Sequence, residues 1–379
     1  MSVVLSADLS LGLLVLAGGR SSRMGQDKAG LPWQGGTLLS SLLCRSLAVP
    51  FSEIIISANR PPDLRALPSS LQERIRITAD RFTDCGPLGG MEAGLCAGSC
   101  DWYLVLSTDL PFYDFSPLSD WCAMLHTTPP AKLPQVILPV VNGTEEPLAA
   151  LYSRRILPAV QKALRTRDYR VRHIYAACPI RRVESSGHAL IYMNVNTPSA
   201  YKDARARAVN LKRRVPVVTI AAGQSHAGKT TCIVTLIREL TRRGCTVGYI
   251  KSTHHTELAE KAGSDTWRAI QAGAAAVRLC GPPGTLNFHK KSQQLLALAQ
   301  TLPVDIAFIE SRRHGVFPIL EVCRRGYDRL PEPDPHIVAV INDDIPSDSL
   351  SLRHFKTVQI DALVSYIIFL TQESPSHFF

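Results

Sequence analysis

The chain has 379 residues, a formal net charge of +10, and 45% hydrophobic against 20% charged residues. This composition is that of a globular protein, and at roughly 100–200 residues per domain the length predicts two domains. No apolar run approaches the ~18 residues that a membrane-spanning helix needs, so no membrane partner is expected.

The positive charge suits nucleic acid, but no nucleic-acid-binding motif accompanies it and aromatic residues make up only 7%. Small phosphorylated substrates explain the charge equally well, and we expect no nucleic-acid partner. The ten cysteines contain no C-x-x-C pair, which argues against zinc-ribbon or thioredoxin-like chemistry. They are typical of reduced thiols in a cytoplasmic protein. The apolar residues 1–19 carry Asp8 and lack a basic start, so they are expected to end in a strand and not to form a signal peptide.

Short β-rich runs alternate with helical patterns in the first half of the chain. Strands are expected at 12–17, 53–58, 74–79, 102–107 and 135–141. Helices are expected at 37–47, 91–97, 154–164 and 199–208. Alternation of apolar strands with helices predicts a parallel sheet covered on both faces.

A basic run that includes Arg205, Lys212, Arg213 and Arg214 precedes a fresh strand and marks the boundary between two domains. We expect a first domain over 1–208, a linker over 209–214 and a second domain over 215–379. After the linker, strands are expected at 215–221, 246–251, 275–279, 306–309, 319–322 and 336–341, with helices at 229–243 and 361–371. The predicted fold class is α/β, with two three-layer α/β/α domains.

The first glycine-rich loop is L-A-G-G-R-S-S-R-M-G-Q-D-K at 16–28, directly after an apolar run. Gly18 and Gly19 allow the backbone to approach a ligand closely, and Arg23 and Lys28 supply fixed positive charges for a triphosphate. Asp109 follows the apolar run 102–106, where open α/β sheets bind ligands, and its carboxylate suits Mg²⁺. Gly18, Lys28 and Asp109 together indicate transfer of a nucleoside monophosphate.

This half resembles the molybdenum cofactor guanylyltransferase (MobA) family. The resemblance rests on the loop at 16–28, S-A-N-R at 57–60, G-P-L-G-G-M at 86–91, T-D-L-P at 108–111 and N-V-N-T-P at 194–198. The loop alone marks the wider superfamily of nucleotidyltransferases, whose fold is Rossmann-like. The closing N-V-N-T-P together with D-K-A is more specific to the MobA family.

The resemblance implies a role for each matching position. Backbone contacts to the guanine nucleotide are assigned to Leu16, Ala17, Gly18 and Gly19. Lys28 would bind the phosphates, Asp109 would bind Mg²⁺, and Asn59 and Asp80 would line the base and ribose pocket. Asn194 and Asn196 would flank the pterin or the metal. Asn59 and Asp80 also suit a turn residue and a strand-end cap, and Asn196 is open to a structural interpretation as well.

The second loop, G-Q-S-H-A-G-K-T at 223–230, fits the P-loop pattern G-x-x-x-x-G-K-[ST] between a strand and a helix. The candidate nucleotide-binding residues here are Gly223, Gly228, Lys229, Thr230 and Thr231. Lys229 is expected to reach the β- and γ-phosphates, and Thr230 is expected to bind Mg²⁺. No N-K-x-D motif that would read guanine follows the loop.

The second half resembles MobB, the P-loop adaptor of molybdopterin guanine dinucleotide synthesis. The matching features are the P-loop, K-S-T-H-H at 251–255, G-S-D-T at 263–266, A-G-A at 272–274 and F-I-E at 308–310. Two departures matter: Ser252 and Thr256 interrupt the family's K-H-x-H-H-D, and Ser311 replaces the glycine of V-E-G-[FY]-K. Adjacent strand residues point to opposite faces, so His254 and His255 cannot easily hold one metal ion. Asp265 and Glu310 remain candidate groups near Mg²⁺.

Together the two resemblances imply a fused transferase and adaptor. GMP would pass from GTP to molybdenum-bound molybdopterin, with Mg²⁺ as cofactor, and the second domain would bind GTP. Molybdenum insertion proteins, apo-molybdoenzymes and a second copy of the chain, through the second domain, are the further partners it suggests. The alternatives are a CTP-dependent molybdopterin cytidylyltransferase or another nucleotidyltransferase, a non-catalytic nucleotide-regulated assembly factor, and a P-loop kinase or GTPase.

Overall fold

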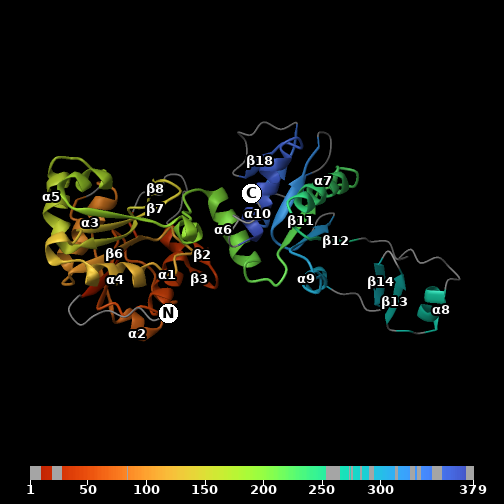
Figure 1. The fold of residues 1–379 in the computed structure, drawn as a ribbon, viewed down its shortest axis with the longest axis horizontal. Coiled ribbons are helices and arrows are strands. Elements are labelled where there is room, and N and C mark those ends of the chain that lie inside the picture. Colours follow the sequence, from red (N-terminus) through yellow and green to blue (C-terminus); the bar gives the residue numbers. More distant parts are fainter. Residues whose placement is uncertain are drawn as a thin grey trace. The chain divides into compact units, whose positions relative to one another are not determined.

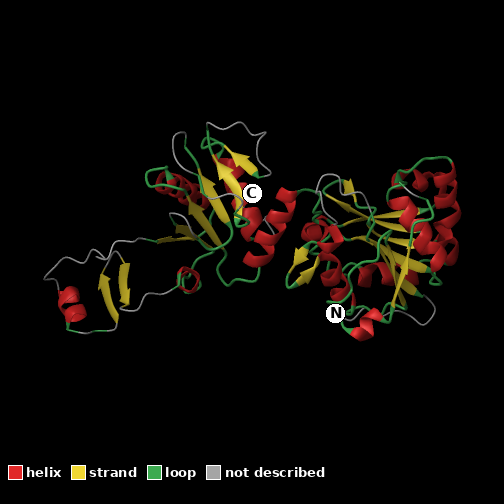
Figure 2. Cartoon of the chain, turned by 180° about the vertical axis from the view of Figure 1, so that it is seen from behind, coloured by secondary structure: helices red, strands yellow, loops and turns green. Residues whose placement is uncertain are grey.

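The computed structural model describes residues 10–18, 28–82, 84–252, 265–272, 274, 276–281, 284–289, 294–311, 315–324, 329–330, 334–343 and 352–372. The chain divides into two compact units, Met1–Tyr201 and Lys202–Phe379. In each unit the strands form a layer with helices on either side (Figures 1 and 2). The fold is therefore α/β with three-layer α/β/α units, as predicted.

The first unit is built on an eight-stranded sheet with the order β10-β7-β9-β6-β1-β4-β5, and β8 pairs with β7. Its strands are β1 (Leu11–Leu16), β4 (Glu53–Ser57), β5 (Ile75–Thr78), β6 (Trp102–Ser107), β7 (Val136–Val141), β8 (Thr144–Glu145), β9 (Ala149–Ser153) and β10 (Ile180–Glu184). A small ribbon joins β2 (Pro32–Trp33) and β3 (Gly36–Thr37). The helices are α1 (Leu38–Ser46), α2 (Ser69–Gln72), α3 (Pro87–Ala97), α4 (Leu118–Thr127) and α5 (Leu157–Arg165). Short 3-10 turns are η1 (Lys28–Gly30), η2 (Pro130–Lys132), η3 (Arg154–Ile156), η4 (Val171–Ala177) and η5 (Ser186–Tyr192).

Two strands, β8 and β9, depart from the expected parallel sheet. Strand β9 pairs antiparallel with both β6 and β7. The chain reverses at Asn142 and Gly143, whose positive φ angles of 48° and 76° close the tight β7–β8 hairpin. This pair of left-handed residues fits the turn that antiparallel strands prefer, and Asn-Gly is its usual sequence signal. The prediction of an all-parallel sheet was wrong here because this signal was not used.

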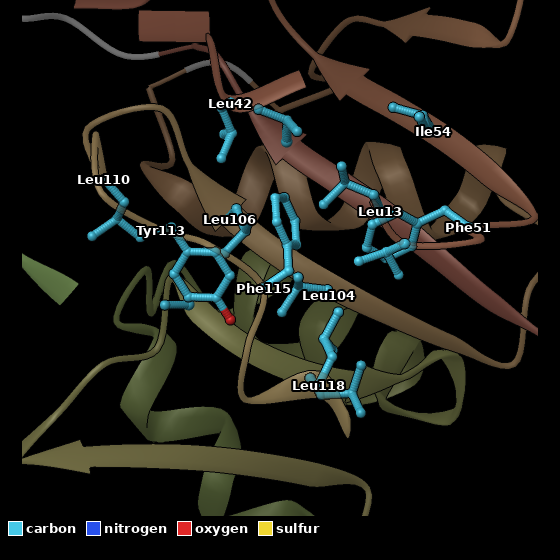
Figure 3. Close-up of a cluster of buried hydrophobic side chains, with 14 of the residues drawn as sticks. Leu13, Leu42, Phe51, Ile54, Leu104, Leu106, Leu110, Tyr113, Phe115 and Leu118 are labelled. Carbon is cyan, nitrogen blue, oxygen red and sulfur yellow. The ribbon is translucent and has the colours of Figure 1, made fainter. Parts of the chain in front are cut away.

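Apolar side chains alternate between the two faces of the first sheet and form two cores. Leu13 packs with α1 and α4, whereas Leu14 packs with α3 and α5. Figure 3 shows part of the first core, in which Leu13 and Leu104 lie near Phe115. Burying a large apolar side chain contributes roughly 1.5–3 kcal/mol, so these two layers supply much of the stability of the unit.

Helix α3 packs unusually close to the sheet because of its glycines. A Cβ atom on Gly94 would lie 2.3 Å from Leu14, and one on Gly90 would lie 3.0 Å from Leu16 and from the Ser57 hydroxyl. Any side chain at these positions would push the helix away from β1 and β4. The glycines therefore set the position of the N-terminal end of α3 above the end of β1.

The second unit has a six-stranded parallel sheet with the order β12-β15-β11-β16-β17-β18. Its strands are β11 (Val217–Ala221), β12 (Val247–Lys251), β15 (Ile306–Glu310), β16 (Ile319–Val322), β17 (Ile337–Ile341) and β18 (Arg353–Phe355), with a separate ribbon of β13 (Ala276–Gly281) and β14 (Gly284–His289). Its helices are α7 (Lys229–Arg242), α8 (Asp265–Gln271), α9 (Leu295–Ala299) and α10 (Ile360–Thr371). Helices α7 and α10 share one core with the sheet, and α9 packs on another cluster.

The division between the units falls inside helix α6 (Pro198–Asn210), ahead of the domain boundary expected at residue 208. The latter part of α6 is bonded to the second unit. Asp203 is buried and accepts from Arg353 Nε and from the Tyr366 hydroxyl, each at 2.6 Å, and Asn210 donates to the Leu370 carbonyl at 3.2 Å. These contacts join residues far apart in the chain, which explains why local composition placed the boundary later.

Within the described ranges, no helix is long and apolar enough to cross a membrane. The cysteines whose side chains the structure describes are all free.

Glu53 is a structural carboxylate at the start of β4. It accepts from the backbone N–H groups of Ser99 and Cys100 at 2.7 and 2.9 Å and from the Tyr103 hydroxyl. Burial alone would raise the pKa of Glu53, but these hydrogen bonds outweigh it and lower the pKa from 4.5 to about 2. The ionised carboxylate therefore stabilises the fold above about pH 4.5, and this stability is lost as the pH falls toward 2.

Glu53→Gln is expected to lower the free energy of unfolding at neutral pH by roughly 1–3 kcal/mol, the usual contribution of hydrogen bonds to a charged group. The loss should shrink as the pH is lowered through 4, which urea denaturation at several pH values would measure. Asp63→Asn is the control, because its ion pair with Arg65 is exposed and such pairs contribute little. Equal stability of the Glu53→Gln and unmodified chains at neutral pH would contradict the assignment.

Candidate functional site

Three segments of the first unit meet at the Lys28 ammonium group. Its Nζ lies 3.3 Å from Asp109 Oδ2 and 2.5 Å from Asn196 Oδ1. The Val195 N–H donates to the Asp109 carbonyl at 2.8 Å, which holds the N-V-N-T-P segment beside the end of β6. The structure thus brings together Lys28, Asp109 and Asn196, three of the residues predicted to act on phosphates, metal or pterin.

Asp109 is suited to bind a divalent cation. The residue is 8% exposed, and in the described part of the chain its Oδ1 atom has no hydrogen-bond partner. Lys28 pairs with Oδ2, and a second cation at Oδ1 would satisfy the remaining polar atom of this buried side chain. The carboxylate of Asp109 and the amide oxygen of Asn196 are hard oxygen donors of the kind Mg²⁺ prefers. These residues therefore fit the metal that the sequence implies.

Asn194 lies next to a carboxylate that sequence reasoning missed. Glu146 follows β8, and its pKa is raised by burial, lowered in part by a hydrogen bond with Asn194 and raised further by the charge of Asp109. Its backbone N–H donates to the Pro139 carbonyl at 3.0 Å. The site therefore has a second acidic group, and no local motif around Glu146 would have indicated it.

Asn59 and Asp80 form a hydrogen-bonded pair at the ends of β4 and β5. Asn59 Nδ2 donates to Asp80 Oδ2 at 3.2 Å, the Asp80 N–H donates to Asn59 Oδ1 at 3.0 Å, and the Ser57 hydroxyl donates to Asp80 Oδ1 at 2.7 Å. A Cβ atom on Gly18 would lie 3.7 Å from Asn59 Nδ2, so the first phosphate loop leaves β1 beside this pair. The pair therefore borders the predicted nucleotide loop.

The glycine-rich start of α3 borders the same carboxylate. A Cβ atom on Gly89 would lie 2.8 Å from the Phe82 carbonyl and 3.5 Å from Asp80 Oδ2. The close packing of α3 against the sheet therefore also places the first turn of this helix beside the Asp80 carboxylate.

A pocket of about 510 Å³ opens in the first unit. Its lining combines the first residue of α3, the segment before β9, and the loop before η4 with the first residues of η4. It consists of Pro87, Pro147, Leu148, Tyr169, Arg170, Val171, Arg172 and His173. The Leu148 carbonyl accepts from the Ser107 N–H at 3.0 Å, two residues before Asp109. The pocket wall is thus bonded directly to the strand that carries Asp109.

The P-loop of the second unit joins β11 to α7. Gly228 has a φ of 95°, a left-handed conformation that favours glycine, and α7 begins at Lys229. Lys229 Nζ donates to the Gln224 carbonyl at 3.0 Å, across the loop. The N-terminal end of a helix with a lysine beside it is an anion-binding arrangement.

Glu310, at the end of β15, lies against the P-loop threonine. The Thr230 hydroxyl lies 3.1 and 3.0 Å from its two carboxylate oxygens, and the Tyr249 hydroxyl donates to Oε2 at 2.6 Å. Burial and the bond to Glu310 raise the pKa of Tyr249, so its phenol stays a donor at neutral pH. A hydroxyl and a carboxylate at this place are oxygen donors of the kind that Mg²⁺ takes, and the metal role of Thr230 stays a prediction. Tyr249 was not foreseen.

Several predicted residues cannot be placed. Gly19, Arg23, His254 and His255 lie outside the described residues.

The remaining predicted residues are described. The Ala17 N–H, next to Leu16 at the end of β1, donates to the Ser57 carbonyl at 2.8 Å. Gly223 lies at the start of the P-loop, Thr231 is exposed in the first turn of α7, and Asp265 is exposed at the start of α8.

Two family models match the chain. Residues 13–183 match the MobA-like NTP transferase domain, and residues 217–343 match molybdopterin guanine dinucleotide synthesis protein B. A molybdenum cofactor guanylyltransferase from Vibrio atlanticus is 31% identical over 187 residues, which cover 49% of this chain and 90% of that protein. A probable molybdenum cofactor guanylyltransferase from Bacillus cereus is 25% identical over 203 residues, covering 51% and 94%.

Solved structures resemble each half separately. Molybdopterin-guanine dinucleotide biosynthesis protein A from Archaeoglobus fulgidus matches at 19% identity and a TM-score of 0.42, covering 52% of this chain and 98% of that one. Bacillus subtilis MobB matches at 20% identity and a TM-score of 0.33, covering 40% and 96%.

The sequence relatives define the class of protein as a nucleotidyltransferase, an enzyme. Within that class the chain belongs to the MobA-like NTP transferase family, and residues 217–343 of its second half match the model of molybdopterin guanine dinucleotide synthesis protein B.

Asp109→Asn is expected to reduce nucleotidyl transfer by at least about 100-fold, because metal-assisted charge stabilisation contributes several kcal/mol. The melting temperature should change little, since the amide keeps the shape of the side chain. Steady-state kinetics beside a thermal melt would measure both. Asp114→Asn, which alters an exposed turn carboxylate bonded to Ser116, is the matched control. Undiminished turnover of Asp109→Asn would contradict the metal role.

Proposed function

We propose that the first unit transfers GMP from GTP to molybdenum-bound molybdopterin, giving the molybdopterin guanine dinucleotide cofactor and pyrophosphate. The family supports a general role in this synthesis. The observation that carries the proposal is the meeting of Lys28, Asp109 and Asn196 at one ammonium group, beside a buried carboxylate oxygen that has no hydrogen-bond partner among the described residues.

The nucleotide would lie over the start of the first phosphate loop. Leu16, Ala17 and Gly18 offer backbone groups at the end of β1, and Gly18 has room because it carries no side chain next to Asn59. Asn59 and Asp80 lie at one side of this position, where a carboxylate held in place by Ser57 can accept from ribose hydroxyls or guanine N–H groups.

The acceptor would enter through the 510 Å³ pocket, whose wall is bonded to the strand that carries Asp109. The acceptor carries a phosphate monoester, and arginine side chains bind such anions with two parallel hydrogen bonds. Arg170 and Arg172 line the pocket and are exposed. Pro147 and Leu148 supply apolar surface for the ring system of a pterin.

The reaction is a displacement at the α-phosphorus of GTP. An oxygen of the acceptor phosphate forms the new P–O bond, the bond between the α-phosphorus and the bridging oxygen breaks, and the electron pair leaves with pyrophosphate. Because the nucleophile is already an anion, no strong general base is needed. Lys28 and Arg23 would offset charge on the phosphate oxygens. Bound to Asp109, Mg²⁺ would add charge stabilisation and orientation.

The second unit would bind GTP at the P-loop and serve as an adaptor. Fusion places one unit at an effective concentration in roughly the mM range for the other. Molybdenum insertion proteins and apo-molybdoenzymes are the partners that such an adaptor would serve, with dimerisation through the second unit. The site of action would be the cytoplasm.

The base preference is tested with the full chain, molybdenum-loaded molybdopterin and either GTP or CTP. GTP is expected to support dinucleotide formation at a kcat/KM at least about 100-fold above CTP, because a site built for one base leaves buried polar groups unpaired with the other. Chromatography of the released dinucleotide would measure this. Faster reaction with CTP would replace the guanylyl assignment by a cytidylyl one, and no dinucleotide from either would overturn the proposal.

Arg170→Ala is expected to raise the KM for molybdopterin roughly 10-fold or more, because a charge-assisted bond to phosphate contributes about 1.5–3 kcal/mol. The KM for GTP should stay unchanged. Arg65→Ala, which removes an exposed arginine of the same unit that pairs only locally with Asp63, is the control. If the KM for GTP rises instead, the result would indicate that the nucleotide, and not the acceptor, binds in this pocket.

A further inference from the structure

Tyr249 makes a contact that the P-loop pattern does not require. Its hydroxyl donates to Glu310 Oε2 at 2.6 Å, while the Thr230 hydroxyl lies 3.0 Å from the same oxygen and 3.1 Å from Oε1. Glu310 is 7% exposed, so this carboxylate sits out of water and between two hydroxyl groups. The three side chains form one connected group at the P-loop.

The sheet itself places Tyr249 in this group. Strand β12 is the edge strand beside β15, with Tyr249 opposite Phe308 and Lys251 opposite Glu310. Residues two apart on a strand point to the same face, so Tyr249 and Glu310 share one face of the sheet. Phe308 lies on that face in the core that α7 covers. Tyr249 therefore reaches the carboxylate from the edge strand, on the same face of the sheet as the helix that carries Thr230.

We propose that Tyr249 is a positioning residue for a magnesium–nucleoside triphosphate at the P-loop, acting through Glu310 and Thr230. The inference rests on the proposed binding of nucleotide by the second unit. Tyr249 holds the carboxylate where it accepts the hydrogen of the Thr230 hydroxyl. The lone pairs of that hydroxyl oxygen are then directed away from Glu310 and toward the metal position.

The chemistry of a hydroxyl group explains why fixing the Glu310 carboxylate beside Thr230 matters for metal binding. Threonine has one hydrogen to donate and two lone pairs. Within the first turns of a helix its hydroxyl also bonds readily to backbone carbonyls of the preceding turn, which would turn the lone pairs elsewhere. Because Tyr249 fixes the Glu310 carboxylate, the Thr230 hydroxyl donates to Glu310 and not to a backbone carbonyl before the nucleotide binds. The phosphates themselves would be bound by the loop backbone and Lys229.

The test is equilibrium binding of GTP to the full chain, carried out in a Lys28→Ala background that disables the first site. Affinity is measured by calorimetry with Mg²⁺ and again with EDTA. Adding Tyr249→Phe is expected to weaken binding roughly 3- to 10-fold with Mg²⁺, and to leave binding in EDTA unchanged. The change removes one oxygen atom and keeps the ring.

Tyr366→Phe is the matched control, because this phenol also donates to a carboxylate of the second unit, that of Asp203 at 2.6 Å. It is expected to lower the melting temperature and to leave both affinities unchanged. Equal weakening by Tyr249→Phe with Mg²⁺ and with EDTA would show a general structural effect and overturn the positioning role. Unchanged or tighter binding with Mg²⁺ would also overturn it.

Lys229→Ala in the same background separates this inference from the function on which it rests. If it abolishes GTP binding while Tyr249→Phe changes nothing, the P-loop binds nucleotide and only the role of Tyr249 is wrong. If Lys229→Ala leaves GTP binding intact, the P-loop is not the nucleotide site, and both proposals are overturned.

Discussion

One ammonium group ties together the first site. Lys28 Nζ lies between the Asp109 carboxylate and the Asn196 amide, which are 81 and 168 residues away along the chain. This contact brings together the end of β6, the turn η1 and the N-V-N-T-P segment. Adjacent parallel strands end at one edge of a sheet, and β1 and β6 are such a pair. The residues proposed to act on the substrate thus meet at one contact at that edge.

The close packing of α3 serves this edge as well. Gly90 and Gly94 let the helix lie against β1, and Gly89 brings it beside Asp80, whose carboxylate is held by Ser57 and Asn59. A side chain at Gly94 would clash with the buried Leu14 side chain, so one of the two would have to shift. The glycines thus allow the close contact of α3 with β1 that places the start of the helix beside Asp80.

The two units treat their acidic groups differently. Asp109 is paired with an ammonium group and keeps one buried oxygen without a partner in the described residues. Glu310 has both oxygens engaged by hydroxyl groups, from Thr230 and Tyr249. The first arrangement offers a ligand atom directly to a metal, which suits a transfer reaction. The second fixes a neighbouring threonine and suits binding, in line with an adaptor.

The sequence by itself determined most of the local structure and the chemical class. The apolar runs predicted the bounds of β6 and β16 correctly at both ends. The two glycine-rich loops identified Lys28 and the P-loop. Both kinds of prediction succeed because periodicity and motif spacing are local properties of the chain. The tertiary contacts alone show that α6 is bonded to the second unit, that Glu146 lies in the first site and that Tyr249 lies in the second. These features depend on side chains that meet although they are far apart in the chain. No local pattern records which of many polar residues will share a buried carboxylate.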